Sequence, residues 1–439
     1  MPTGVRFPRL EDWLDWQQSL HPQAIELGLD RVRRVLARTG WRHPEQPVIT
    51  VAGTNGKGSV VSLVSAMLRA GGYRVGAFTS PHLVDYRERI RIDGELVSEA
   101  SLVAAFERIV DALGGDSLTF FEFNTLAALL VFETAAPDAI LLEVGMGGRL
   151  DAVNLVDPDV AIVVSVGLDH MEWLGDDVET IGREKAGVFR AGRPAIVGTP
   201  EPPRSVLEAA ASLAAPLLLR GRDFDGIERA DGAWDYRDGA GVLDALPRPA
   251  LAGTVQVGNA ATAIAALRRL SSRLPLERAA IEAGLRTASL QGRFQRLDDG
   301  RGFEWVLDVA HNPDSARVLA ANLACLPAPG RTIAVCGMLA DKDVASVVEL
   351  LRERIDLWFA ATTDGPRGLD ARELARRAQA AGIHMAAAGS VVDAMRVAGN
   401  EARPGDRVVV FGSFHSVGPA LSHLQYEQEA QGGPSPPRV

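Results

Sequence analysis

Cysteine is nearly absent from this chain: only Cys325 and Cys336 occur among its 439 residues. They form no Cys-x-x-Cys pair, so a disulfide framework and a cysteine-based zinc site are excluded. We interpret both as small apolar core residues in a reducing compartment. Residues 1–10 lack the apolar stretch of a signal peptide, and no apolar run reaches membrane-spanning length. We therefore expect a cytoplasmic protein with no membrane partner.

An excess of positive charge is also missing. The chain has 46 Lys and Arg against 56 Asp and Glu, a net charge of −10. Nucleic acids and acidic membranes are bound by basic faces, so this balance argues against both as partners. Local basic pockets for phosphate groups remain compatible with it. At 439 residues the chain is too long for one ordinary core, and we expect two or three domains.

What is present is a glycine-rich turn directly after the apolar run Val48–Ala52, with the sequence Gly53-Thr54-Asn55-Gly56-Lys57-Gly58-Ser59. A β-branched run that leads through such a turn into a helix is typical of a phosphate-binding loop. Converging backbone N–H groups, the helix N-terminus and the charge of Lys57 would all favour an anion. The usual loop has a glycine five positions before its Gly-Lys pair, where this chain has Val51. The motif predicts a bound nucleoside triphosphate and names no reaction.

The first 290 residues alternate between predicted strands and helices after a helical start that His21-Pro22 interrupts. Predicted strands are Val48–Ala52, Arg74–Phe78, Ala139–Val144, Val160–Val166 and Ala195–Gly198. Predicted helices are Gly58–Arg69, Ser98–Leu113, Phe121–Glu133, Val178–Phe189 and Asn259–Leu270. Several strands are apolar throughout, as in a parallel sheet covered on both faces, which predicts a doubly wound α/β domain. The polar stretch Glu201–Pro249 predicts short hairpins or loops.

A second alternating series follows the glycine-containing boundary near Gln291. Strands are expected at Trp305–Val309, Thr332–Cys336, Leu357–Thr362, His384–Ala387 and Val408–Phe411. Helices are expected at Ser315–Leu323, Val344–Arg354, Ala371–Ala381 and Val391–Ala398. This pattern predicts a smaller α/β domain over residues 291–427, after a first domain over residues 1–290. The Gly- and Pro-rich residues 428–439 are expected to form a disordered tail.

Polar residues gather where the predicted strands end, the edge at which open α/β sheets bind ligands. Ser80 follows one strand, Glu143 lies near the end of another and His170 follows a third. A buried acid needs a partner, and beside a phosphate loop Mg²⁺ is a natural one for Glu143, with Ser80 and His170 as further ligands. The competing interpretation is a salt bridge from Glu143 to Arg149 and a structural His170. Taken together with Lys57, these residues favour a metal site.

Three other features allow two interpretations each. The cluster Gly145–Gly148 is a tight turn or a ligand contact, and Asp151 after it favours contact. Phe120–Phe123 opens a helix, where aromatic residues are more often core than a stacking platform. Lys185, on pattern alone, is a solvated helix lysine or part of a salt bridge.

The ordered set of motifs resembles the dihydrofolate synthase/folylpolyglutamate synthase family of the Mur ligase superfamily. The segments that carry the resemblance are Gly-Thr-Asn-Gly-Lys-Gly-Ser, Thr-Ser-Pro-His-Leu, Phe-Phe-Glu-Phe, Leu-Glu-Val-Gly-Met-Gly-Gly-Arg-Leu-Asp-Ala, Asp-His-Met-Glu-Trp-Leu-Gly, Arg-Glu-Lys-Ala-Gly, Gly-Arg-Phe, Asp-Val-Ala-His-Asn-Pro and Gly-Ser-Phe-His-Ser-Val. They run in order over nearly the whole chain. The resemblance implies a P-loop central domain of the Mur type followed by a Rossmann-like C-terminal domain.

The resemblance to this family also implies an ATP- and Mg²⁺-dependent ligase. L-Glutamate would be added to dihydropteroate, giving dihydrofolate, and to the γ-carboxylate of tetrahydrofolate, giving polyglutamates. Each reaction would pass through an acyl phosphate, because a free carboxylate is a poor electrophile. The active site would lie in a cleft that the C-terminal domain closes over ATP and glutamate, and we expect a monomer.

The resemblance assigns roles to individual residues. Those implied to hold ATP are Gly53, Thr54, Asn55, Gly56, Lys57, Gly58, Ser59, Asn259, Arg293, Asp308 and His311. Ser80, Glu143 and His170 would hold Mg²⁺, and Lys57, Glu143, His170 and Lys185 form the catalytic set. Lys185 corresponds to a lysine that the family carries as a carbamate. Those implied to contact the pterin side are Phe121, Glu122, Phe123, Asn124, Leu150, Asp151 and Ala152, with Asn124 in place of a second aromatic residue.

Three other functions stay open. One is a folylpolyglutamate synthase without the dihydropteroate reaction. Another is a Mur-type amino-acid ligase acting on a nucleotide-linked peptidoglycan precursor, which the Phe-Phe-Glu-Phe and Gly-Met-Gly-Gly-Arg-Leu-Asp segments disfavour. The third is a P-loop switch or transport ATPase, a class that does not need a second α/β domain to close on a substrate.

Overall fold

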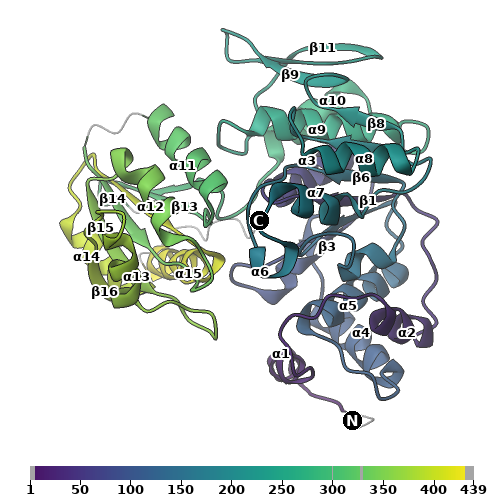
Figure 1. Ribbon diagram of the computed structural model, residues 1–439, viewed down its shortest axis with the longest axis horizontal. Coiled ribbons are helices and arrows are strands. Elements are labelled where there is room, and N and C mark those ends of the chain that lie inside the picture. The colour runs from purple at the N-terminus through teal and green to yellow at the C-terminus, as the bar shows by residue number, and fades with distance from the viewer. Residues whose placement is uncertain (1–4, 299, 327–329, 431–439) are drawn as a thin grey trace. The chain divides into compact units, whose positions relative to one another are not determined.

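The computed structural model describes residues 5–298, 300–326 and 330–430, and its chain divides into two compact units (Figure 1). The N-terminal domain comprises the chain up to Pro81, Arg87–Ala250 and Val257–Ala288. The C-terminal domain begins at Ser289 and also includes two short segments from earlier in the chain, His82–Tyr86 and Leu251–Gln256. Among the helices that the structure describes, none is both long and apolar enough to cross a membrane.

The N-terminal domain is built on an eight-stranded sheet with the order β4-β3-β2-β5-β1-β6-β7-β8. Its strands are β1 Val48–Ala52, β2 Val75–Phe78, β3 Ile90–Ile92, β4 Glu95–Leu96, β5 Ala139–Glu143, β6 Val160–Val163, β7 Ala195–Val197 and β8 Leu217–Leu219. Along the sheet, the neighbouring strands β2, β5, β1, β6, β7 and β8 are parallel. At the edge beyond β2, the β2–β3 and β3–β4 pairs are antiparallel. Every residue of β1 and β5 is buried, as helices on both faces of a parallel sheet require. The predicted doubly wound fold is confirmed.

The helices of this domain begin and end at recognisable signals. They are α1 Leu10–Ser19, α2 Asp30–Arg38, α3 Lys57–Ala70, α4 Glu99–Ala112, α5 Phe120–Ala135, α6 Met171–Leu174, α7 Val178–Ala186, α8 Arg204–Ser212, α9 Gln256–Arg269 and α10 Arg278–Thr287. α5 starts with a reciprocal capping box, in which the Thr119 hydroxyl accepts from the N–H of Glu122 and the Glu122 carboxylate accepts from the N–H of Thr119. Short 3₁₀ turns lie at Tyr86–Arg89 and Ala152–Leu155.

Two predictions for this domain need correction. The strand expected over Val160–Val166 ends at Val163, because the following residues turn back to bond the glycine-rich loop after β1. The stretch Glu201–Pro249 is more regular than expected, since it contributes α8 and the sheet strand β8. Its later part does form the predicted hairpins, as a separate antiparallel sheet of β9 Phe224–Glu228, β10 Trp234–Asp238 and β11 Gly241–Leu246.

The C-terminal domain, green to yellow in Figure 1, has a six-stranded sheet with the order β12-β13-β17-β14-β15-β16. Its strands are β12 Gln295–Asp298, β13 Glu304–Asp308, β14 Thr332–Cys336, β15 Leu357–Thr362, β16 Ala386–Ser390 and β17 Arg407–Phe411. Only β12 is antiparallel to its neighbour. Alternate strand residues face two cores: Val306, Ala334 and Val409 lie in one, Leu307, Val335 and Val408 in the other.

Helices cover both faces of this second sheet. They are α11 Pro313–Cys325, α12 Val344–Leu351 with a 3₁₀ turn Arg352–Arg354, α13 Ala371–Gln379, α14 Val391–Glu401 and α15 Phe414–Ala430. The strand predicted at His384–Ala387 lies at Ala386–Ser390, because the alanine-rich run gives little periodicity to place it. α15 extends to Ala430, so the first three residues of the predicted tail are helical, and residues 431–439 lie outside the described part of the chain.

Candidate functional site

The glycine-rich loop connects β1 to the first turn of α3. Gly56 caps the helix at φ +84°, a left-handed conformation that side chains rarely adopt. A Cβ at Gly56 would lie 2.8 Å from Val164 Cγ1 and 3.2 Å from the Asn259 side-chain oxygen. A side chain at residue 56 would therefore have to displace Val164, and Asn259 of α9 lies directly beside the loop. Lys57 Nζ donates to the Gly53 carbonyl across the loop at 3.0 Å.

The loop is held against the end of β6 by reciprocal hydrogen bonds. Ser165 Oγ accepts from the Asn55 N–H and donates to the Asn55 carbonyl, both at 2.9 Å. The Thr54 hydroxyl donates to the Gly167 carbonyl at 3.1 Å and accepts from the Gly167 N–H at 2.9 Å. Sequence reasoning missed Ser165. Its only signal is its position at a strand end beside the loop strand, which becomes visible once β6 is known to pair with β1.

Two of the three residues expected to bind a metal are shown in contact. The Ser80 N–H donates to Glu143 Oε2 at 3.3 Å, and Glu143 is buried, only 4% exposed, at the end of β5. His170 precedes α6 at φ +51°, an uncommon conformation for a residue with a side chain. The competing salt bridge from Glu143 to Arg149 is wrong, since the Arg149 guanidinium pairs with Glu184 at 2.8 Å.

The donors present fit a hard divalent cation in part. A carboxylate, a hydroxyl and an imidazole supply fewer ligands than Mg²⁺ takes, and Mg²⁺ commonly completes its shell with phosphate oxygens and water. Within the described residues there is no cluster of three or more His, Cys, Asp or Glu that could hold a metal ion without such help. The set is therefore suited to a cation that arrives with a phosphate ligand.

Lys185 of α7 is buried, so the expectation of a solvated lysine is wrong. Burial lowers the pKa of its amine from 10.5 to about 7, and the positive charge of Lys57 contributes in the same direction. Asp169 and Asp151 act on the same amine in the opposite sense. Lys185 therefore lies within electrostatic range of Lys57, Asp151 and Asp169, although these residues come from α3 and two different strand ends.

The segment after β5 combines tight packing with one buried acid. Gly148 lies against α7, where a Cβ would be 2.8 Å from the Glu184 carbonyl oxygen. Asp151 accepts from the N–H groups of Met146 and Val153 at 2.9 and 3.0 Å. Burial raises the pKa of this carboxyl to about 6, against the opposing effect of those hydrogen bonds. Both Asp151 oxygens are thus committed to the backbone of their own loop.

In the first turn of α5, the residues expected on the pterin side differ in exposure. Phe121 is partly exposed, and its ring lies beside Gly145, with the Phe78 ring 5.9 Å away. Phe123 is fully buried between Trp16 and Phe106, with ring centroids 6.0 and 5.4 Å away, so its side chain belongs to the core.

The other expected pterin contacts are also mostly buried. The oxygens of Glu122 are taken by Arg31 and the Thr119 N–H. Asn124 and Ala152 are buried, whereas Leu150 is partly exposed. Of the α5 set, Phe121 alone presents an accessible ring.

Three expected ATP contacts lie together in the C-terminal domain. Asp308, at the end of β13, accepts from the N–H groups of Phe294 and Ala310 at 2.9 and 2.8 Å. Burial raises the pKa of its carboxyl, and the nearby charges of Arg293 and His311 oppose that rise. The Arg293 guanidinium stacks over the Phe414 ring at 5.4 Å. His311 donates from Nδ1 to the Val309 carbonyl at 2.7 Å, which fixes the orientation of its ring.

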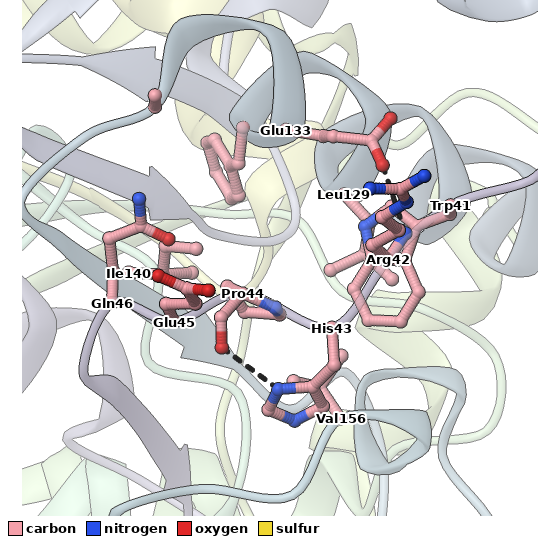
Figure 2. A pocket seen from close by; sticks show the side chains of 12 residues that line it. Trp41, Arg42, His43, Pro44, Glu45, Gln46, Leu129, Glu133, Ile140 and Val156 are labelled. Atoms are coloured by element: carbon pink, nitrogen blue, oxygen red, sulfur yellow. Dashed lines mark hydrogen bonds between the residues drawn. The ribbon is translucent and has the colours of Figure 1, made fainter.

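A separate cavity of about 250 Å³ lies at the other end of the N-terminal sheet (Figure 2). It is lined by Trp41–Gln46, which precede β1, and by Ile140 at the start of β5. Figure 2 shows His43 bonded within this segment, to the carbonyl of Pro44. Because ligands of open α/β sheets bind at the carboxyl ends of strands, this cavity is not the candidate site.

Two family models match the chain. The Mur ligase middle domain matches residues 51–198, and the Mur ligase glutamate ligase domain matches residues 292–414. A dihydrofolate synthase/folylpolyglutamate synthase of Escherichia coli K12 is 44% identical over 411 residues, covering 93% of this chain and 94% of that one. The chain belongs to the dihydrofolate synthase/folylpolyglutamate synthase family.

Further relatives of the family extend the likeness to structure. The enzyme of the same name from Haemophilus influenzae is 37% identical, covering 93% of this chain and 96% of its own. The structure of E. coli FolC in complex with DHPP and ADP superposes with a TM-score of 0.90 at 42% identity, covering 98% of this chain and all of that one. A bifunctional enzyme with Mn, AMPPNP and L-glutamate bound superposes with a TM-score of 0.88 at 43% identity, covering 96% and 100% of the two chains.

Proposed function

We propose that the protein is an ATP- and Mg²⁺-dependent ligase that adds L-glutamate to dihydropteroate and to the γ-carboxylate of tetrahydrofolate. The observation that carries this proposal is the position of Lys185 within electrostatic range of Lys57, Asp151 and Asp169 in the N-terminal domain. A phosphate loop, the proposed catalytic lysine and the loop next to Phe121 thus meet at one end of one sheet. Relatives whose names carry both activities match nearly the whole chain.

The chemistry follows from the substrate. An oxygen of the substrate carboxylate attacks the γ-phosphorus of ATP, ADP leaves, and an acyl phosphate results. The glutamate amine then attacks the acyl carbon, a proton leaves the nitrogen, and inorganic phosphate departs. Both steps depend on positioning and charge neutralisation, which backbone N–H groups of the loop and the Lys57 ammonium supply. Ser80, Glu143 and His170 would hold Mg²⁺, which neutralises phosphate charge when bound.

Lys185 is assigned a modified state in this proposal. An amine whose pKa is about 7 is neutral in a large fraction at neutral pH and can attack CO₂. Its nitrogen forms a bond to the carbon, a proton leaves, and the side chain becomes an anionic carbamate. That reversal of charge suits a group beside a cation site and removes the repulsion between Lys185 and Lys57.

The remaining residues keep their proposed roles as contacts. Gly53–Ser59 and Asn259 would hold ATP in the N-terminal domain, and Arg293, Asp308 and His311 would contribute from the C-terminal domain. Phe121 is the pterin platform, next to Leu150–Ala152. We also propose a monomer in the cytoplasm, a reducing environment compatible with both free thiols. Cys336 is buried, whereas Cys325 is exposed, so the interpretation of Cys325 as a core residue is wrong.

The test is substrate-dependent release of ADP by the purified protein with ATP and Mg²⁺. Dihydropteroate plus glutamate and tetrahydrofolate plus glutamate should each stimulate release, with a product one glutamate heavier by mass spectrometry. Stimulation by tetrahydrofolate alone would identify a monofunctional folylpolyglutamate synthase. ATP hydrolysis that ignores both folates would point to a switch or transport ATPase, and ligation only of a nucleotide-linked peptidoglycan precursor to another Mur-type ligase.

A further inference from the structure

Four charged or titratable side chains connect the N-terminal segment to the first turn of α5. We call His21, Glu26, Arg31 and Glu122 the Arg31 network. His21 contacts Ser117 Oγ through Nδ1 and Glu26 through Nε2, both at 2.7 Å. Arg31 donates to Glu26 through Nη1 and to both Glu122 oxygens through Nη2, at 2.7 and 2.9 Å. The network thus links residues that are 91 positions apart in the chain.

The network ends in the first turn of α5, next to Phe121. The Glu122 carboxylate accepts from the Thr119 N–H at 2.7 Å and from Arg31 at the same time. Arg31 thus holds the carboxylate in the position that caps α5. Phe121 is the neighbouring residue in this turn. Because the Phe121 ring packs closely against Gly145, a shift of this turn by a few tenths of an ångström would change that contact.

The network is poorly explained as a source of stability. The Arg31 and Glu122 side chains are 16% and 5% exposed, so both charges lose most of their hydration. For such pairs the desolvation penalty roughly offsets the attraction, and replacement by apolar groups is often neutral or stabilising. Arg31 Nε is also buried with no hydrogen-bond partner among the described residues, which adds a further cost. Fixing a position is the benefit that remains.

We infer that Arg31 and Glu122 are positioning residues for the pterin-bearing substrate. They act through the first turn of α5 and set the orientation of the Phe121 ring, and they contact neither ATP nor glutamate. This inference rests on the proposed function, because it needs Phe121 as the pterin platform. It assigns Glu122 a role different from the direct pterin contact that the family resemblance implies.

The experiment compares Arg31→Lys, Arg31→Met and the double variant Arg31→Met/Glu122→Gln in steady-state kinetics. Lysine keeps the charge and loses the forked geometry. We expect the KM for dihydropteroate to rise roughly tenfold in Arg31→Met and less in Arg31→Lys, with kcat and the KM for ATP changing less than about twofold. In the double variant no buried charge is left without a partner, so the melting temperature should recover while the KM stays high.

Arg108→Gln is the matched control. Arg108 of α4 pairs at 2.6 Å with Glu133, which lies near the C-terminal end of α5. Loss of this pair should reduce stability without changing the KM for dihydropteroate. The inference is overturned if Arg31→Met leaves that KM unchanged, if the double variant restores KM together with stability, or if Arg108→Gln raises KM equally. A wild-type protein that ligates neither folate overturns the proposed function itself, and the inference with it.

Discussion

The edge of the Phe121 ring lies against Gly145, so that a Cβ at residue 145 would lie 2.5 Å from Phe121 Cζ and 2.6 Å from Cε2. One residue opens α5 and the other follows β5, and their contact joins the two segments expected to face the pterin. Only a residue without a side chain permits this approach. The glycine after β5 is therefore a packing requirement of the Phe121 ring, the proposed pterin platform, and the loop after β1 has a separate glycine requirement at Gly56.

We expect Gly145→Ala to impair the pterin side selectively. The added methyl group must displace the Phe121 ring, and overpacking of this kind costs about 1–3 kcal/mol. The KM for dihydropteroate should rise while ATP binding, measured by calorimetry, stays unchanged. Gly239→Ala is the control, since a Cβ there meets nothing within 4 Å. An unchanged KM in Gly145→Ala would contradict the assignment of Phe121 as the platform.

Gly56→Ala should impair nucleotide binding and leave the pterin side unaffected. The left-handed conformation at φ +84° costs an alanine roughly 1–2 kcal/mol, and its Cβ would also meet Val164 at 2.8 Å. The loop would have to open, and its N–H groups would no longer converge on the phosphates. Calorimetric affinity for ADP should fall, with dihydropteroate binding retained. Equal ADP affinity in the variant and the wild type would refute the role of this loop.

Removing the proposed charges at the phosphate site should abolish both activities. Lys57→Ala and Glu143→Gln are each expected to lower kcat by about 10²–10³, the scale of losing one preorganised charge-stabilising group. Chelation of divalent cations should do the same to the wild-type protein, and added Mg²⁺ should restore it. Circular dichroism must show each variant folded, and a folded variant that keeps wild-type turnover would remove its residue from the mechanism.

Much of this arrangement can be predicted from the sequence, because long buried strands and their ends leave local signals. Thr332–Cys336 and Leu357–Thr362 are strands with the expected bounds. The expectation that ligand-binding residues lie where strands end selected both Ser80 and Glu143. These two residues are 63 positions apart in the chain and contact each other. Edge strands such as Glu95–Leu96 are too short to show a period of two, so pattern reasoning overlooks them.

The remaining features depend on partners that are distant in sequence. Arg31 resembles any exposed helix arginine until its contact with Glu122 is known. Burial likewise could not be inferred for Lys185, because a lysine within a polar helix gives no sign of which face it occupies. The family resemblance implies a functional role for Lys185, and the structure shows that its amine is desolvated and within electrostatic range of Lys57.

Carbamylation of Lys185 should be detectable directly. In ¹³C-bicarbonate at pH 8, the folded protein should show one carbamate carbon resonance that is absent from Lys185→Arg and from the unfolded protein. Lys185→Arg keeps a positive charge and cannot form the carbamate, so its activity should fall by about 10² or more. A fully active Lys185→Arg protein, or a wild-type spectrum without the resonance, would rule the modification out.

The raised pKa of buried Asp151 predicts that its contribution to stability decreases as the pH rises, which is the opposite of the usual behaviour of an acidic side chain. Its pKa is raised from 3.8 to about 6, so the folded state keeps the proton where the unfolded chain has lost it. The contribution of Asp151 is therefore fully present below pH 4, decreases as the pH rises from about 4 to 6, and changes little above that. At 1.36 kcal/mol per pKa unit the loss is about 3 kcal/mol.

The measurement is the free energy of unfolding in urea between pH 4 and 7, for the wild type and Asp151→Asn. The variant loses one acceptor for the Met146 or Val153 N–H and should be less stable overall. It cannot titrate, so the difference between the two proteins should shrink as the pH rises from 4 to 6, because only the wild type loses stability to ionisation of Asp151. A difference that stays constant across this range would show that Asp151 ionises at its ordinary pKa, and would require solvent or a compensating cation at the carboxylate.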